Sequence, residues 1–196
     1  MNCVAPPTLI VKPDTERVVY PDLTEKQYCR GKGYILSLGV LNGRLNFTFT
    51  ASRDTAYIQF KDLIGRKALF LVLRNGDIEA WDMQNNLRYD QASILLSLPF
   101  FELISSGELR SFLWGQIPDV FSDPDLIKSK PKKLSGEIQF QSSQTEFGPL
   151  IKKVLFNIEK EKQTIEMVMM DREFDLQYPH LIRDIPSTIV PIKVNS

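Results

Sequence analysis

Apolar and polar residues alternate with a period of two along much of the first half of the chain. Residues 44–50 and 55–61 each place an apolar side chain at every second position. Successive side chains of a β-strand point to opposite faces, so this period predicts two strands that each have one apolar face. That face carries Leu45, Phe47, Phe49, Ile58 and Phe60.

Short polar turns separate these predicted strands from their neighbours. Asn42-Gly43 and Asn75-Gly76 are two-residue hairpin signals, because Asn and Gly both tolerate a positive φ. The sequence therefore predicts an antiparallel meander. Its strands cover residues 34–41, 44–50, 55–61, 67–74 and 77–83. The segment 67–74 is apolar on both faces, so we expect both of its faces to be covered.

The period changes to that of a helix over residues 90–118, which predicts two or three short apolar helices. Pro99 separates the first helix from the next. Ser105 and Glu108 fit a capping box that opens the last helix, and Gly115 would end it. Alternation then returns and predicts strands at residues 136–141, 152–159, 163–170, 173–178 and 188–194.

These elements predict a mainly β fold with short helices. A long antiparallel sheet with a Phe-rich face curls, and an incomplete barrel would leave a concave apolar cavity for the helices to cover as a lid. Such a cavity holds an acyl chain without any catalytic group. Its predicted lining is Leu45, Phe47, Phe49, Ile58, Phe60, Phe70 and Trp81, with lid residues Leu95, Phe101, Leu109 and Phe112. The same side chains could instead form the core of a closed sandwich or barrel.

The turn at residues 62–66 carries two large aliphatic side chains, Leu63 and Ile64, before Gly65. Turn tips face water and are normally polar. Two explanations are open: the side chains insert into a lipid interface, with neighbouring Lys and Arg meeting headgroups, or they fold back under the helices as core.

The N-terminal segment is Pro-rich and follows a cysteine, Cys3. We interpret residues 1–22 as an extended tether and residues 23–196 as a single domain. A cysteine before an extended tether is how a processed bacterial lipoprotein begins, with its targeting segment removed. A cytosolic protein with a chance cysteine at this position is the alternative.

The charges balance, with 24 Lys and Arg against 24 Asp and Glu. This balance argues against nucleic acid as a partner, since phosphate binding shows as a basic excess. No apolar run approaches the roughly 20 residues needed to cross a bilayer. The one histidine, His180, has no evident metal or catalytic partner, and phosphate-loop and nucleophile-elbow motifs are absent. We therefore expect neither an enzyme nor a metal or cofactor site.

An ordered series of motifs over residues 31–119 resembles the outer-membrane lipoprotein receptor LolB and the related carrier LolA. Arg30-Gly31 leads into an alternating aromatic strand, LNFTFTA. There follow FKDLIGRKAL, LVLRNGDIEAWDMQNNLRYD and LLSLPFFELISSGELRSFLWGQIPD. The family tends to show Pro-Leu-Gly at the apolar turn, where this chain has Leu63-Ile64-Gly65.

The resemblance implies an incomplete barrel with a helical lid at about residues 90–115 and a cavity for lipoprotein acyl chains. It implies a receptor anchored through Cys3 at the periplasmic face of the outer membrane, which accepts cargo from a periplasmic carrier protein. Leu63, Ile64 and Gly65 would then form a loop that contacts the membrane. A soluble periplasmic carrier, another lipid-binding lipoprotein, and a non-catalytic assembly scaffold remain alternatives. We expect a monomer.

Overall fold

The computed structural model describes residues 9–12, 18–39, 42–91, 93–94, 101, 103–122, 135–159 and 162–192. The strands are β1 (Leu9–Lys12), β2 (Cys29–Leu38), β3 (Gly43–Ala51), β4 (Ala56–Lys61), β5 (Lys67–Arg74), β6 (Asp77–Asp82), β7 (Leu87–Tyr89), β8 (Gly136–Thr145), β9 (Gly148–Ile158), β10 (Gln163–Phe174) and β11 (Val190–Pro191). The helices are α2 (Ser106–Trp114), α3 (Asp119–Ser122) and the 3₁₀ turn η2 (Pro179–Leu181).

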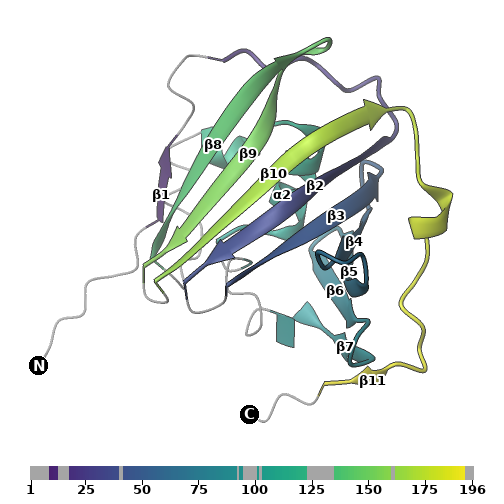
Figure 1. Cartoon of the computed structure of the whole chain (residues 1–196). Helices are drawn as coiled ribbons and strands as arrows, with labels where there is room; N and C mark the ends of the chain where they lie inside the picture. Colours follow the sequence, from purple (N-terminus) through teal and green to yellow (C-terminus); the bar gives the residue numbers. More distant parts are fainter. Residues whose placement is uncertain are drawn as a thin grey trace, which may run out of the picture.

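All these strands belong to one sheet in the order β1-β8-β9-β10-β2-β3-β4-β5-β6-β7-β11. Its inner pairs are antiparallel, whereas β1 pairs with β8 and β11 with β7 in parallel. The sheet is strongly curved and does not close into a barrel (Figure 1). The prediction of a mainly β protein built on a curved sheet is confirmed.

Two glycines on the inner face of β2 let the neighbouring strand pack closely. A Cβ added to Gly31 would lie 2.7 Å from the Phe49 ring, and one added to Gly33 would lie 2.6 Å from the Phe47 ring. These two phenylalanines are the direct cross-strand partners of the glycines. Their rings therefore lie across β2, which draws the inner face together and favours a concave sheet.

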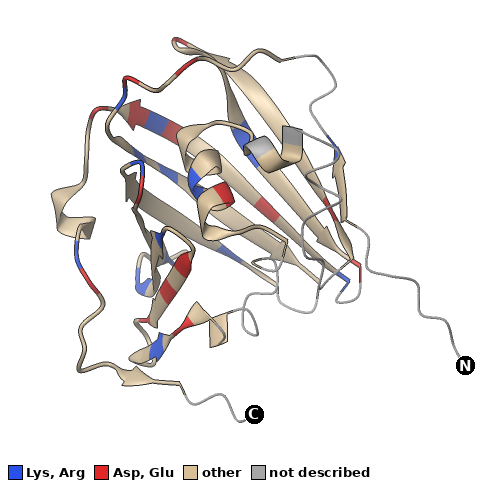
Figure 2. Ribbon diagram, turned by 180° about the vertical axis from the view of Figure 1, so that it is seen from behind, with Lys and Arg blue, Asp and Glu red and all other residues tan. Residues whose placement is uncertain are grey.

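Helix α2 lies on the concave side of the sheet (Figure 2). It begins at Ser105, whose side chain accepts from the Glu108 amide while the Glu108 carboxylate accepts from the Ser105 amide. It ends at Gly115 in the left-handed conformation. The predicted capping box and helix end are both confirmed. The apolar side of α2 contributes Leu109, Phe112, Leu113 and Trp114 to the main hydrophobic cluster.

The opposite face of the sheet is covered at β5 and β6 by the C-terminal segment. Phe70 and Val72 of β5 pack there against Ile185 and Ile189 in a second, smaller cluster. The next side chains along β5, Leu71 and Leu73, are buried in the main cluster. Both faces of this strand are thus covered, as its unbroken apolar run predicts.

Several predicted boundaries change. The predicted strands 163–170 and 173–178 form one strand, β10, which ends at Phe174 and carries a bulge between Met169 and Asp171. Of the predicted strand 188–194, residues 188–192 are described, and Val190–Pro191 form a strand among them. Within the predicted tether, residues 9–12 form β1, and Leu9 is buried. Across the described part of the chain, no helix is both long and apolar enough to span a bilayer.

Candidate functional site

The concave wall brings together most of the residues predicted to line an acyl-chain cavity. Strands β3 and β4 contribute Phe47, Phe49, Ile58 and Phe60 to the main hydrophobic cluster. The same cluster includes Phe101 and, from α2, Leu109 and Phe112. Leu45 packs at the edge of the same cluster. Leu95 and Cys3 lie outside the described residues.

Two of the predicted lining residues do not belong to this wall. Phe70 and Trp81 point to the outer face of the sheet, where they contribute to the cluster under the C-terminal segment. Their assignment to the same cavity as Phe47 is wrong. Residues of β5 and β6 alternate in their direction, so Leu71, Leu73, Ile78 and Ala80 take the inward positions instead.

The side chains of the concave wall are closed over in this structure. Phe49, Ile58 and Phe112 have no exposed surface, so neighbouring atoms cover them completely. An apolar cavity is not shown by the described residues. The cavity and the movement of a lid therefore remain predictions, and the wall with α2 is the candidate place for them.

Helix α2 is fastened to the sheet at its N-terminal end by polar contacts. The Ser106 hydroxyl donates to the Arg74 carbonyl at 3.0 Å. The Arg110 guanidinium donates to the Asp54 carbonyl at 2.6 Å and to the Asn75 side chain at 2.8 Å. These contacts join the helix to the β3–β4 and β5–β6 turns.

The C-terminal end of α2 is held by Arg172, which projects from β10. Its Nε donates to the Leu113 carbonyl at 2.7 Å, and its Nη2 donates to the carbonyls of Phe112 and Ile151. Burial lowers the pKa of the Arg172 guanidinium to about 10. The group is nevertheless protonated at neutral pH, and its charge is favourable at the carbonyl end of a helix.

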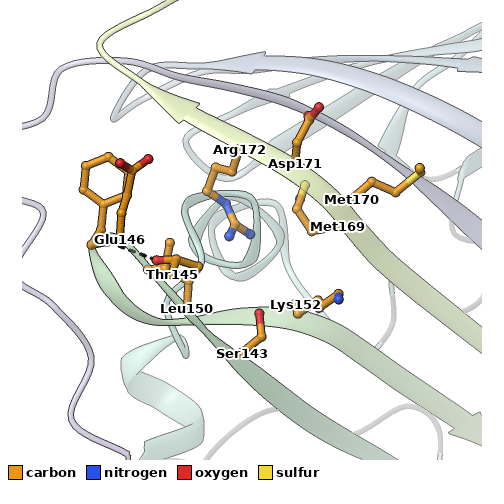
Figure 3. A pocket seen from close by; sticks show the side chains of 10 residues that line it. Ser143, Thr145, Glu146, Leu150, Lys152, Met169, Met170, Asp171 and Arg172 are labelled. Atoms are coloured by element: carbon orange, nitrogen blue, oxygen red, sulfur yellow. Dashed lines mark hydrogen bonds between the residues drawn. The ribbon is translucent and has the colours of Figure 1, made fainter.

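Arg172 lies where β9 and β10 separate. The two strands pair only as far as Lys153 and Val168. Beyond that point a pocket of about 230 Å³ opens between them, lined by Ser143, Thr145, Glu146, Phe147, Leu150, Lys152, Met169, Met170, Asp171 and Arg172. Figure 3 shows Arg172 reaching from β10 over the end of α2. This pocket has a mixed polar and apolar lining and differs from the predicted acyl cavity.

No feature of the sequence predicted the role of Arg172. The bulge between Met169 and Asp171 shifts the alternation of β10, so that Arg172 faces inward beside Phe174 instead of outward. A bulge of this kind has no reliable sequence signal. The hydrogen bond from Arg172 to the Ile151 carbonyl still joins β10 to β9 beyond the end of their pairing.

The 62–66 turn projects its two aliphatic side chains into solvent. Leu63 and Ile64 are 71% and 77% exposed. The alternative that they fold back into the core is wrong for this structure. Gly65 has a φ of +86° and no atom near its Cβ position, so the tip stands clear of the rest of the molecule.

The Asp62 carboxylate stabilises this turn through hydrogen bonds to other turn residues. Its Oδ1 accepts from the amides of Ile64 and Arg66, and its Oδ2 accepts from Arg66 Nε at 2.7 Å. These hydrogen bonds, chiefly the one from the Arg66 side chain, lower the pKa of the Asp62 carboxyl. A polar frame thus presents two apolar side chains that remain mostly exposed.

The groups with chemical reactivity are dispersed. Cys29 is buried beside the Leu113 carbonyl, and burial raises the pKa of its thiol to about 12, so it carries no thiolate at neutral pH. His180 is exposed and lies near Tyr178, with ring centroids 5.7 Å apart. Among the described residues, no three His, Cys, Asp or Glu side chains gather as metal ligands.

Comparison with known proteins gives a distant structural likeness. No model of a protein family and no curated protein matches the sequence. A solved structure described as an uncharacterized conserved protein from Thermus thermophilus is similar over 83% of this chain and 90% of its own, at 9% identity and a TM-score of 0.35. A likeness this distant carries no argument about function.

Proposed function

We propose that this protein binds acyl chains of lipoproteins on its concave wall and delivers them to a membrane surface. The proposal follows the resemblance to the lipoprotein receptor family. The observation that carries it is the pairing of a concave apolar wall, against which the apolar side of α2 packs, with a turn that exposes two aliphatic side chains. The wall would receive the chains and the turn would touch the bilayer.

Burial of the apolar side chains of α2 and burial of an acyl chain release similar free energies. Burial of Leu109, Phe112, Leu113 and Trp114 stabilises the closed form by about 6–12 kcal/mol, at about 1.5–3 kcal/mol for each side chain. An acyl chain with about 14 methylenes gains about 11 kcal/mol on burial, at about 0.8 kcal/mol for each. Because the two quantities are comparable, α2 could exchange with a chain in either direction, which suits transfer better than storage.

The topology supports a common membrane-facing end for the turn and the N-terminus. β1 is parallel to β8 and begins opposite Gly136, where β8 begins. β8, β10 and β3 run in the same direction, and β4 ends opposite Asn46 near the start of β3. The chain therefore enters β1 at the end of the sheet that carries the 62–66 turn. A lipid on Cys3, at most about 20 Å from Leu9, would anchor this end.

In this proposal the protein is a receptor at the periplasmic face of the outer membrane, supplied by a periplasmic carrier. A soluble carrier of the same superfamily differs only in lacking the lipid on Cys3. The complete coverage of Phe49, Ile58 and Phe112 favours a second candidate, an assembly scaffold with a filled apolar core that binds another protein. Acyl-chain binding separates the two candidates.

Titration with an environment-sensitive fluorescent acyl probe tests the proposal. Arg110→Ala removes the contacts that hold the start of α2, and each such hydrogen bond contributes about 0.5–1.5 kcal/mol. If α2 must yield to the chain, this variant should bind the probe about 2–10-fold more tightly. Arg88→Ala, on the outer side of the sheet beside Glu79, is the matched control and should bind as the wild type does. Absence of probe binding by the folded wild type would favour the scaffold.

A further inference from the structure

We propose that a pocket on the outer face of the sheet, directly behind the 62–66 turn, binds the phosphate group of an anionic lipid. This inference rests on the proposed membrane contact and assigns it a specific site. The pocket has a volume of about 290 Å³. It is lined by Lys32, Gly33, Arg44, Asn46, Phe47, Thr48, Lys61 and Met170.

The strand register explains why three cations surround one depression. Arg44, Asn46 and Thr48 occupy successive outward positions of β3. Asn46 lies opposite Lys61 of β4, and Thr48 lies opposite Lys32 of β2. Cationic side chains from three adjacent strands therefore converge around the polar side chains of β3.

The charge of this pocket is not balanced by its own lining, which contains no carboxylate. Lys32 is paired with Asp171 at 2.8 Å, outside the lining. Arg44 stacks on the Tyr34 ring, with its Cζ 4.1 Å from the ring centroid. Within the described part of the chain, neither Arg44 nor Lys61 forms an ion pair. Two other cations on this face do have carboxylate partners, in the pairs Arg30–Glu173 and Lys153–Glu166. Two free cations beside neutral donors suit an anion with several oxygen atoms, and a phosphate has that form.

The place of the pocket identifies the source of the phosphate. Lys61 immediately precedes Asp62, the residue that frames the exposed turn. If Leu63 and Ile64 enter the bilayer, Lys61 lies at the level of the headgroups. Met170, which is 60% exposed at the rim of the pocket, adds apolar surface beside the charges. A lipid headgroup and free phosphate share the same chemistry, so the experiment includes both.

Vesicle cosedimentation compares phosphatidylcholine vesicles with and without phosphatidylglycerol. The wild type should prefer the anionic vesicles, and Arg44→Gln and Lys61→Gln should each reduce binding to them by about five-fold. Binding of these variants to the neutral vesicles should not change. Lys152→Gln neutralises an exposed lysine on β9, outside this pocket, and should behave as the wild type. Ile64→Asn should weaken binding to both vesicles, because it removes the apolar contact.

The vesicle and phosphate experiments decide whether the pocket binds a phosphate group. The pocket is overturned if Arg44→Gln and Lys61→Gln bind anionic vesicles like the wild type, or if Lys152→Gln loses as much as they do. If the wild type binds neither vesicle, the membrane contact itself fails and inorganic phosphate decides. NMR shifts of the Asn46 and Thr48 amides with phosphate, absent in Lys61→Gln, would then support a site for free phosphate, and no shifts would overturn the site.

Discussion

The concave wall and the 62–66 turn use the same kind of residue in opposite ways. Phe49 and Phe112 are fully buried, whereas Ile64 at the turn is 77% exposed. The apolar residues of the wall stabilise the fold, and the exposed ones at the turn contribute little buried area to it. Apolar side chains held in water by a polar frame point to an external partner, while the same residues in the wall are also explained by folding alone.

The largest effect should come from the wall. Phe112→Ala leaves a cavity between α2 and the sheet, and we expect it to lower the free energy of unfolding by about 3–5 kcal/mol. Urea denaturation measures this loss. Leu63→Ala removes an aliphatic group of the turn and should change stability by less than about 0.5 kcal/mol. Equal losses in the two variants would contradict the division between wall and turn.

The second largest loss of stability should come from substitution of Arg172. Arg172→Met leaves the Phe112, Leu113 and Ile151 carbonyls without their donor, which should cost about 3 kcal/mol. Arg172→Lys restores a cation but not the fork of donors, so it should recover part of the loss. Hydrogen exchange should show that the amides of α2 become the most exposed. Uniform destabilisation of the sheet, with α2 unaffected, would show that Arg172 does not hold the helix.

The smallest effect concerns the turn and depends on pH. The pKa of Asp62 is lower in the folded protein than in the unfolded chain, so its stabilising contribution is present above the unfolded value, about 3.9, and is lost as the pH falls through the folded value. Amide exchange of Ile64 and Arg66 should therefore accelerate in acid, beyond the intrinsic pH dependence. Asp62→Asn should remove that extra acceleration. A turn whose protection does not change as the pH is lowered from 7 through the folded pKa of Asp62 would show that Asp62 does not frame it.

The sequence predicted the parts of this fold that depend on local periodicity. The alternation of residues 44–50 and 55–61 corresponds to β3 and β4, and the capping box at Ser105 corresponds to the start of α2. The start of β2 was missed because Gly31 and Gly33 resemble turn residues. Their close packing against phenylalanine rings is visible only in the folded sheet.

The candidate site was less predictable because it depends on which face of the sheet each side chain occupies and on how the strands pair. Phe70 and Trp81 fall on the outer face, since an apolar run does not tell which of its alternate residues points inward. The pocket of Arg44 and Lys61 arises from strand pairing, so the sequence alone could not reveal it. Exposure of Leu63 and Ile64 required knowing that α2 does not extend over the turn.

Quenching of Trp114 tests most directly whether the concave wall accepts an acyl chain. The chain contains two tryptophans, and Trp81→Phe on the outer face leaves Trp114, buried on α2, as the reporter. A brominated fatty acid that enters beneath α2 should quench this fluorescence in a saturable, one-to-one manner. Absence of quenching in the folded variant, below the concentration at which the fatty acid forms micelles, would contradict the account.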